Sequence, residues 1–229
     1  MKRSLGAAGL LIAAGCLNTA DTSNALTLDF DFNTVGENYV SGLADVPASQ
    51  VADVALTGEL RALPAPLDVN RKALYLAGTN VSGDLFLFSQ KYITGLFPNV
   101  TYRASLQVNY ASNYPQGCTT GIGPGTFIKA GVSELQLIPA ADNQDVLRMN
   151  INVGDHTGGG DYTRLGDIRN GLPGCLLPGV FAIAGTGAQR QTVSFTTDAA
   201  GGFFLWFGID SSVPGRAEIY FTALRLVLF

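Results

Sequence analysis

The sequence has few charged side chains and only one histidine. Asp, Glu, Lys and Arg make up 14% of the 229 residues, and 14 basic residues stand against 18 acidic ones. A protein that binds nucleic acid needs a basic face, which this balance does not provide, so we expect no nucleic-acid partner. A single histidine excludes catalytic mechanisms that need several. Hydrophobic residues make up 47% of the chain, so it is not intrinsically disordered.

Helical patterns are also scarce. No stretch shows a convincing apolar repeat of 3.6 residues, and only a short helical turn is expected, near residues 49–54. Residues 101–111 instead alternate between apolar and polar, which predicts a β-strand with one buried face. The positions that we expect to face a core are Tyr102, Ala104, Leu106, Val108 and Tyr110.

Short β-rich runs separated by turn residues continue along the chain. We expect strands at 27–33, 54–60, 73–77, 85–93, 101–111, 126–137, 146–152, 190–196, 203–210 and 217–228. This spacing predicts an all-β fold, a single antiparallel β-sandwich of the jelly-roll type formed by residues 26–229. The run FFLWFGI at 203–209 is apolar on both faces. It is either a central strand covered on both sides or a strand whose outer face is a site.

Residues 1–15 have the pattern of a bacterial secretory signal. Two basic residues precede an apolar stretch that is too short to cross a bilayer, since a membrane helix needs about 20 apolar residues. The small residues directly before Cys16 resemble a lipobox, the recognition sequence of bacterial lipoproteins. The resemblance implies cleavage before Cys16 and diacylation of its thiol. An ordinary signal-peptidase cut after Ala20 or Ala25 is the alternative.

Residues 16–25 are mostly small and polar, so we expect a flexible tether between a membrane anchor and the folded domain. Leu17 stands at the position where an acidic residue would resemble an inner-membrane retention signal. We therefore expect a protein of the bacterial cell envelope, held by its lipid at the outer membrane or cell surface. A periplasmic or secreted protein is the alternative.

Three cysteines are an odd number for an exported protein, so one is left over from disulfide pairing. If Cys16 carries a lipid, Cys118 and Cys175 remain, and both lie in loops rich in glycine and proline. Export permits a disulfide between these two residues. Two unpaired, buried thiols are the alternative.

Seven segments together resemble an uncharacterised family of exported bacterial proteins. They are 73–78, 83–88, 93–112, 127–133, 147–154, 165–171 and 218–228. No activity comes with that resemblance. The strand order and the closing strand also resemble carbohydrate-binding jelly rolls of the galactose-binding type. That likeness concerns architecture only, and a fold does not fix a function.

Jelly rolls of the galactose-binding type often hold a structural Ca²⁺, with an acidic ligand from the last strand. Here the corresponding position is Thr222. Asp29, Asp31 and Asn33 are predicted to alternate onto one strand face and offer oxygen ligands, but Ca²⁺ takes about six to eight. Asp29 and Asp31 are thus weak metal candidates, and we expect no cofactor. Solvated carboxylates that discourage edge pairing are the alternative.

No complete catalytic motif is present. His156 lies in the stretch GDHTGGGD, which is either a metal or acid–base site with its neighbouring aspartates or a polar loop tip. The chain has no G-x-S-x-G motif for a serine nucleophile. Glycoside hydrolysis needs two carboxylates at a fixed separation, and the candidates are Asp84, Glu134 and Asp167. The sequence does not decide whether any two of them converge.

Aromatic side chains are the candidates for sugar binding, because the apolar face of a sugar ring stacks on a flat aromatic ring. Tyr114 and Tyr162 lie in or beside loops, so we expect them to be exposed. Tyr92 and Tyr110 are further candidates. Trp206 lies in the doubly apolar strand, where a core position is the default.

Lys129 stands inside an otherwise apolar strand, FIKAGV. It either extends its amine from a solvent-facing side or pairs with a buried acid. Glu134 and Asp167 are the expected partners. A buried pair would be structural as readily as functional.

These observations favour a non-catalytic, exported binding or surface module whose ligand is a glycan or another envelope protein. The residues assigned to binding are Tyr114, Tyr162, Lys129 and Trp206. Two alternatives stay open: a carbohydrate-active hydrolase that uses paired carboxylates, and a purely structural envelope protein. Polar and aromatic side chains that converge on a concave face would favour binding or catalysis over a structural role.

Overall fold

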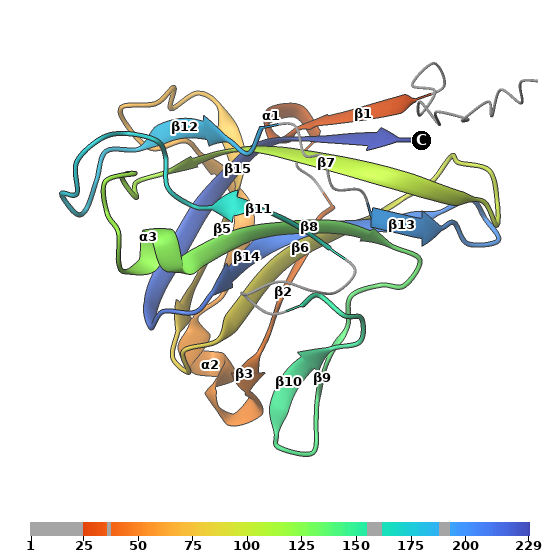
Figure 1. Ribbon diagram of the computed structural model, residues 1–229, viewed down its shortest axis with the longest axis horizontal. Helices are drawn as coiled ribbons and strands as arrows, with labels where there is room; N and C mark the ends of the chain where they lie inside the picture. Colours follow the sequence, from red (N-terminus) through yellow and green to blue (C-terminus); the bar gives the residue numbers. More distant parts are fainter. Residues whose placement is uncertain (1–24, 36–37, 155–161, 188–192) are drawn as a thin grey trace, which may run out of the picture.

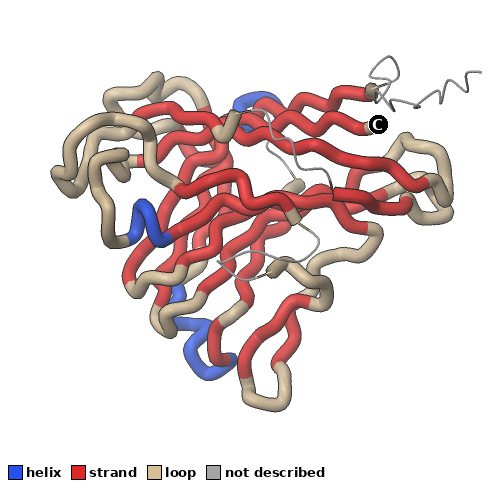
Figure 2. Tube along the Cα trace, in the orientation of Figure 1, coloured by secondary structure: helices blue, strands red, loops and turns tan. Residues whose placement is uncertain are grey.

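The structure is a computed structural model that describes residues 25–35, 38–154, 162–187 and 193–229. Two sheets form most of it (Figure 1 and Figure 2). Sheet A has the order β12 (Ala182–Gly185), β7 (Thr101–Ser112), β15 (Gly215–Leu228), β5 (Lys72–Asn80), β4 (Thr57–Ala62). Two further strands belong to it: β1 (Leu26–Asp31) pairs with β15, and β13 (Val193–Thr196) pairs with β7. Sheet B has the order β11 (Thr163–Asp167), β8 (Thr126–Ser133), β14 (Phe203–Ser211), β6 (Leu85–Ile93), β2 (Val40–Ala44). A small third sheet has the order β3 (Val46–Pro47), β10 (Val146–Met149), β9 (Pro139–Ala141).

All of the described strand pairs are antiparallel. The chain crosses between the sheets repeatedly, because β5, β7 and β15 belong to sheet A whereas β6, β8 and β14 belong to sheet B. Crossing of this kind is the arrangement of a jelly roll. The predicted all-β sandwich is therefore confirmed.

The space between the two sheets holds the larger hydrophobic cluster. Alternate side chains of β7 point into it: Ala104, Leu106, Val108 and Tyr110 are buried, and the half-buried Tyr102 packs against the same cluster. Full burial of one large apolar side chain contributes about 1.5–3 kcal/mol to the free energy that stabilises the folded state. The alternation predicted for this strand is confirmed.

A second hydrophobic cluster lies on the outer face of sheet B. Phe86, Phe88 and Trp206 point outward from β6 and β14. Residues 134–154, which we name the cover, pass over them and contribute Leu137 and Val153 to the cluster. The cover contains β9 and β10, which form a hairpin beside β3 (Figure 1). Strand β14 is thus covered on both sides, one of the two arrangements expected for it.

Several predicted elements have different limits. The helical turn expected near 49–54 is present as η2 (Ala48–Gln50) and α2 (Val51–Val54). The strand expected at 54–60 begins at Thr57, because Ala55 ends the helical turn in the left-handed conformation. The strand expected at 126–137 ends at Ser133, where the chain leaves sheet B to form the cover.

Three strands of the main sheets were not expected from the sequence. They are β2 (VSGLA), β11 (TRLGD) and β12 (AIAG). All three are short and contain glycine, which weakens the local preference for a strand. They form at the edges of the sheets, where pairing with a neighbouring strand decides the conformation. The remaining helical elements are α1 (Phe32–Val35), which ends the first strand early, and α3 (Ile122–Gly125).

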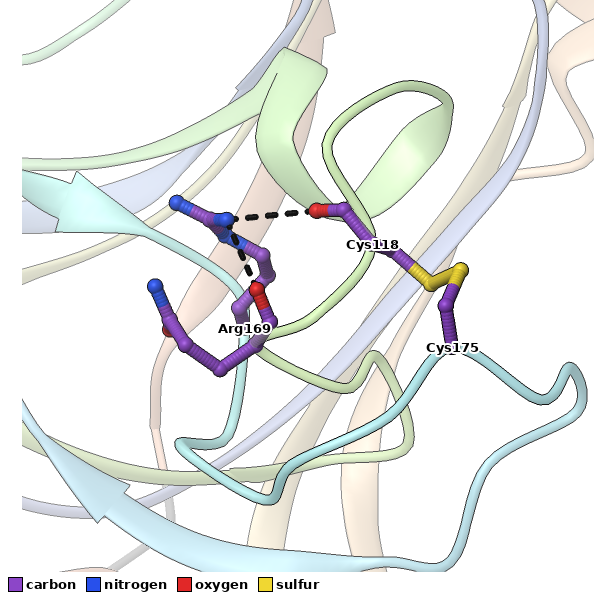
Figure 3. The surroundings of a disulfide bond; sticks show 4 residues. Cys118, Arg169 and Cys175 are labelled. Atoms are coloured by element: carbon purple, nitrogen blue, oxygen red, sulfur yellow. Dashed lines mark hydrogen bonds between the residues drawn. A yellow bond between two sulfur atoms is a disulfide. The ribbon is translucent and has the colours of Figure 1, made fainter.

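Cys118 and Cys175 form a disulfide, as predicted (Figure 3). It joins two loops that also contact each other through their backbones, since Gln116 N–H donates to the Leu172 carbonyl oxygen at 2.8 Å. The Arg169 guanidinium points toward the same loop and donates to the carbonyl oxygens of Gln116 and Cys118, at 3.0 and 3.2 Å. The loops are therefore held by covalent and polar contacts together.

The predicted signal segment 1–15, nearly all of the tether and Cys16 lie outside the described residues, as does His156. The expectations for them stay predictions. Within the four described ranges, no helix is long and apolar enough to cross a membrane.

Candidate functional site

The side chains assigned to binding are all buried. They are Tyr114, Tyr162, Lys129 and Trp206. The expected exposure of the two loop tyrosines is wrong: the Tyr114 hydroxyl donates to the Arg216 carbonyl oxygen at 3.2 Å, and the Tyr162 ring packs in the cluster beneath the cover. Trp206 lies against Gly131, where a Cβ would stand 2.5 Å from the indole. None of the four presents a surface to a ligand.

Tyr110 is buried as well. Its hydroxyl donates to the carbonyl oxygens of Arg169 and Asp167, at 2.7 and 3.1 Å. Burial raises the pKa of Tyr110 to about 12. Its polar end therefore holds the loop that carries Arg169, which is a structural contact.

Lys129 forms a buried ion pair with Asp210. The Lys129 amine lies 2.5 Å from an Asp210 carboxylate oxygen, and both side chains are almost completely buried. The prediction that Glu134 or Asp167 is the partner of Lys129 is wrong. Glu134 is exposed beyond the end of β8, and Asp167 pairs with Arg169 at 2.7 Å. The register explains this result: β8 and β14 place Lys129 opposite Gly208, so that Asp210 is its diagonal neighbour on the same face.

Two buried polar side chains fix the cover to sheet B. The Lys129 amine donates to the carbonyl oxygens of Val153 and Gly154, at 3.1 and 3.0 Å. The Gln90 amide donates to the Leu137 carbonyl oxygen at 2.7 Å and accepts from the Leu137 N–H at 2.8 Å. Lys129 and Gln90 are therefore residues that position the cover, and the outer face beneath it is closed.

The three candidate catalytic carboxylates do not converge. Asp84 precedes β6, whereas Glu134 follows β8 at the opposite end of sheet B, about 30 Å away by strand geometry. Asp167 lies on the edge strand β11, three strands across from β6, which corresponds to about 14 Å. Glycosidases hold their two carboxyl groups about 5–9.5 Å apart. These residues do not form such a pair.

Asp84 instead borders a pocket of about 460 Å³ at one end of sheet B. Arg148 from β10 lies among three carboxylates there: its guanidinium is 2.7 Å from Asp45, 3.5 Å from Asp142 and 3.8 Å from Asp84. A general acid needs a raised pKa, whereas two backbone N–H groups, assisted by Arg148, hold the pKa of Asp142 below its usual value. The group is better suited to holding β10 in place than to acid catalysis.

The candidate metal ligands face guanidinium groups. Asp29 accepts from Arg225 at 2.7 Å, and Asp31 lies 3.3 Å from Arg71. Asn33 lies in α1 rather than β1, so the expected alternation of three ligands on one strand face is wrong. Among the residues that the structure describes, no group of three or more His, Cys, Asp or Glu side chains is placed to hold a metal ion.

An aromatic pair stands near the end of β6, with one ring exposed and the other half-buried. Tyr92 and Phe204 are cross-strand partners on the outer face of sheet B, with ring centroids 5.0 Å apart. Tyr92 is 40% exposed. We name these two rings, together with the carboxylate of Asp198, the Tyr92 platform. The two rings are tilted by 46° to each other, so the exposed Tyr92 ring alone is the flat apolar surface, and the Asp198 carboxylate is the polar group at its edge.

The Tyr92 ring is held in one orientation. Its hydroxyl donates to Asp198 at 2.6 Å, and Asp198 in turn accepts from the N–H groups of Ala200 and Gly202, both at 2.8 Å. A Cβ at Gly202 would stand 1.9 Å from the Tyr92 hydroxyl oxygen, so a side chain at this position would displace the Tyr92 ring from the orientation described. The Tyr92 hydroxyl and the two N–H groups lower the pKa of Asp198, which keeps this acceptor ionised at neutral pH.

The turn that carries Asp198 is itself fixed by the neighbouring loop, residues 94–100. Leu96 N–H donates to the Gly201 carbonyl oxygen and Asn99 N–H to that of Asp198, both at 3.2 Å. The Thr197 hydroxyl donates to the Phe97 carbonyl oxygen at 2.6 Å. Asp198 was not a sequence candidate, although its spacing to Gly202 in DAAGG is typical of a turn that an aspartate organises.

No protein-family model matches this chain, and no curated protein matches it. The enzymatically active domain of tailspike protein 4 from bacteriophage CBA120 is similar at 12% identity with a TM-score of 0.37. The match covers 82% of this chain and 19% of that chain, so this chain spans about a fifth of that protein's length. TmCBM27, a carbohydrate-binding module described for specific mannan recognition, is similar at 13% identity with a TM-score of 0.41, over 89% of this chain and 97% of that chain. Carbohydrate-binding modules of the β-sandwich superfamily, described for promiscuous specificity, give 12% identity and a TM-score of 0.33, over 84% of this chain and 58% of that chain. Values this low carry no conclusion about a ligand, and the predicted kinship with exported bacterial proteins stays a prediction.

Proposed function

We propose that this protein is an exported, lipid-anchored module that binds glycans through the Tyr92 platform. One observation carries the proposal: an exposed aromatic ring on the outer face of a β-sandwich is fixed at its polar end by Asp198 and packed against Phe204. The export and the anchor rest on the leader sequence before Cys16.

The geometry suits a sugar for two reasons. An aromatic ring that is already held in place loses little side-chain freedom when a ligand stacks on it, so less binding energy is lost to ordering. Polar groups stand at the same end of sheet B, because Ser133 is the cross-strand partner of Phe204 and Glu134 follows it. With Asp198 they offer hydrogen-bonding groups for hydroxyls around the stacked ring.

Replacing Tyr92 with alanine is expected to weaken glycan binding at least tenfold. Truncation of an aromatic anchor typically costs about 2 kcal/mol or more, and 1.4 kcal/mol corresponds to tenfold. Affinity electrophoresis against mannan, xylan, mixed-linkage β-glucan and peptidoglycan fragments would identify a bound polysaccharide, and calorimetry would measure the loss.

Tyr92→Phe is the matched control, because it keeps the ring and removes only the hydrogen bond to Asp198. We expect it to bind within a few-fold of the unchanged protein. Ile183→Ala, at an exposed position of sheet A, should have no effect. The proposal is wrong if none of these polysaccharides binds, or if Tyr92→Ala binds as tightly as the unchanged protein. Capture of an envelope protein that survives Tyr92→Ala would favour a protein partner instead.

Mass spectrometry of the mature protein tests the anchor. We expect an N-terminus at Cys16 that carries a diacylglyceryl group, and a Cys16→Ser variant that leaves the membrane fraction. A mature chain that begins at Asp21 or Leu26 would show cleavage by an ordinary signal peptidase and contradict the lipid anchor.

A further inference from the structure

A polar hollow of about 370 Å³ lies on the outer face of sheet A. It forms where two strands meet end to end along β15, which pairs with β5 as far as Phe221 and with β1 from Ala223 onward. The register of β15 against β7 shifts between these two residues, at Thr222. Ala223 lines the hollow, and its small side chain leaves the space open between longer neighbours.

The charged side chains around the hollow form two pairs. Arg225 donates to both carboxylate oxygens of Asp29, at 2.7 and 3.2 Å. Arg71 reaches across from the start of β5 to Asp31, at 3.3 and 3.4 Å. Two negative and two positive charges cancel, so an anionic or a cationic ligand gains no net attraction from this surface. The lining therefore suits an uncharged ligand.

Two amide side chains complete the lining. Gln107 lies opposite Arg225 and Asn109 lies opposite Ala223, both on β7. The Asn109 side chain occupies space beside Gly185 of β12, where a Cβ would stand 2.6 Å from the amide oxygen. Each amide offers two N–H donors and one acceptor oxygen. Asp29, Arg225 and Gln107 thus form a row across three neighbouring strands, about 10 Å wide.

Folding stability does not explain this arrangement. The side chains of both ion pairs are about half exposed, between 47% and 58%. Ion pairs so exposed contribute little to stability, because water and salt screen them. The row of donors and acceptors around a small residue is instead what an uncharged ligand with many hydroxyl groups requires, since each hydroxyl both donates and accepts.

We infer that this hollow is a second carbohydrate site, which binds a neutral sugar by its hydroxyl groups. The inference rests on the proposed glycan-binding function but uses none of the residues of the Tyr92 platform. The ligand binds through hydrogen bonds to Asn109, Gln107 and the Asp29–Arg225 pair. Each hydrogen bond that replaces one to water adds little net affinity, so the main contribution of the hollow is specificity for the orientation of the hydroxyl groups.

Two sites on the outer faces of opposite sheets have a functional consequence. One short oligosaccharide cannot reach both, because the whole sandwich separates them. The module would instead join two polysaccharide chains, or two segments of one long chain, and its avidity for a polymer would exceed its affinity for an oligomer.

Side-chain amide signals in NMR test the inference directly. The ¹⁵N-labelled protein is titrated with manno-, cello- and xylohexaose and with tetra-N-acetylchitotetraose, and the NH₂ signals of Gln107 and Asn109 are assigned from Gln107→Glu and Asn109→Asp variants. We expect at least one of these probes to shift both signals in a saturable manner. The shifts should persist in Tyr92→Ala, because the two sites are independent.

Ala223→Leu fills the hollow without a change of charge and should weaken binding at this site at least tenfold. Val227→Leu is the matched control, since it lies on the same strand and face but outside the hollow. The inference is overturned if no probe moves the amide signals while Tyr92→Ala still loses polysaccharide binding, which would leave the proposed function intact. It is also overturned if Ala223→Leu binds like Val227→Leu, or if oligogalacturonate or chitosan oligomers bind here more tightly than the neutral probes. If the Gln107 and Asn109 signals shift in a saturable manner but Tyr92→Ala does not weaken polysaccharide binding, the result would support this site and reject the Tyr92 platform.

Discussion

Replacing Lys129 with alanine is expected to lower the free energy of unfolding by about 3–5 kcal/mol, the cost of breaking a buried ion pair. The substitution leaves the Asp210 carboxylate buried without its cation. It also removes the donor to the carbonyl oxygens of Val153 and Gly154. Many domains have a total stability of only about 5–15 kcal/mol, so this one change would remove a large share. Denaturation in urea, followed by fluorescence of the single Trp206, measures the loss.

A set of variants separates charge from packing. Lys129→Met keeps most of the apolar stem and should be nearly as damaging as alanine, because the uncompensated carboxylate causes most of the loss. The double variant Lys129→Met/Asp210→Leu should recover most of the stability, since apolar replacement of both partners of a buried pair is often neutral or stabilising. If Lys129→Met costs less than about 1 kcal/mol, the pair is not the contact that we describe.

The double variant also tests the role of Lys129 in holding the cover. Global stability should return, but Val153 and Gly154 would still lack their hydrogen-bond donor. We therefore expect faster amide hydrogen exchange in residues 150–154 than in the unchanged protein, with little change in the β9–β10 hairpin near Gln90 and Leu137, whose own hydrogen bonds remain. Unchanged exchange in residues 150–154 would show that apolar packing alone holds this part of the cover.

The partner of Lys129 shows where prediction from the sequence stops. Alternation along one strand is a local property, so the buried positions of β7 and the two apolar faces of β14 were predictable. The register between β8 and β14 is set by contacts along both strands and by the packing of both faces. A charged residue at the end of the run FFLWFGI was the available signal for Asp210, because its spacing from Trp206 places the two on one face.

The loop tyrosines failed as candidates for a related reason. Tyr162 and Tyr114 lie beside glycine-rich segments, which are usually exposed, but Tyr162 packs beneath the cover and Tyr114 packs in the cluster between the two sheets. Tyr92 was one of several candidate aromatics, and no local pattern ranked it above the others. Its orientation depends on Asp198, which is distant in sequence and comes close only because β6 and β14 are neighbours.

Reduction of the Cys118–Cys175 disulfide is expected to lower the free energy of unfolding by about 2–4 kcal/mol. The bond joins residues 57 positions apart, and the chain-entropy model gives about 4 kcal/mol for a loop of that length. The lower part of the range allows for residual structure in the unfolded chain. The measurement is the shift of the urea midpoint with and without a reductant, with thiol labelling to confirm that the bond has opened.

The native loops should survive this reduction, because other contacts hold them. Arg169 still donates to the carbonyl oxygens of Gln116 and Cys118, and Gln116 N–H still donates to Leu172. The secondary structure and the Tyr92 platform should therefore be unchanged, and the loss should come mainly from a less restricted unfolded chain. A Cys118→Ser/Cys175→Ser variant is the control. Its urea midpoint should equal that of the reduced protein and should not change when the reductant is added. A midpoint that stays fixed while both thiols become labelled would mean that Arg169 and its carbonyl partners, rather than the covalent link, decide the stability of this region.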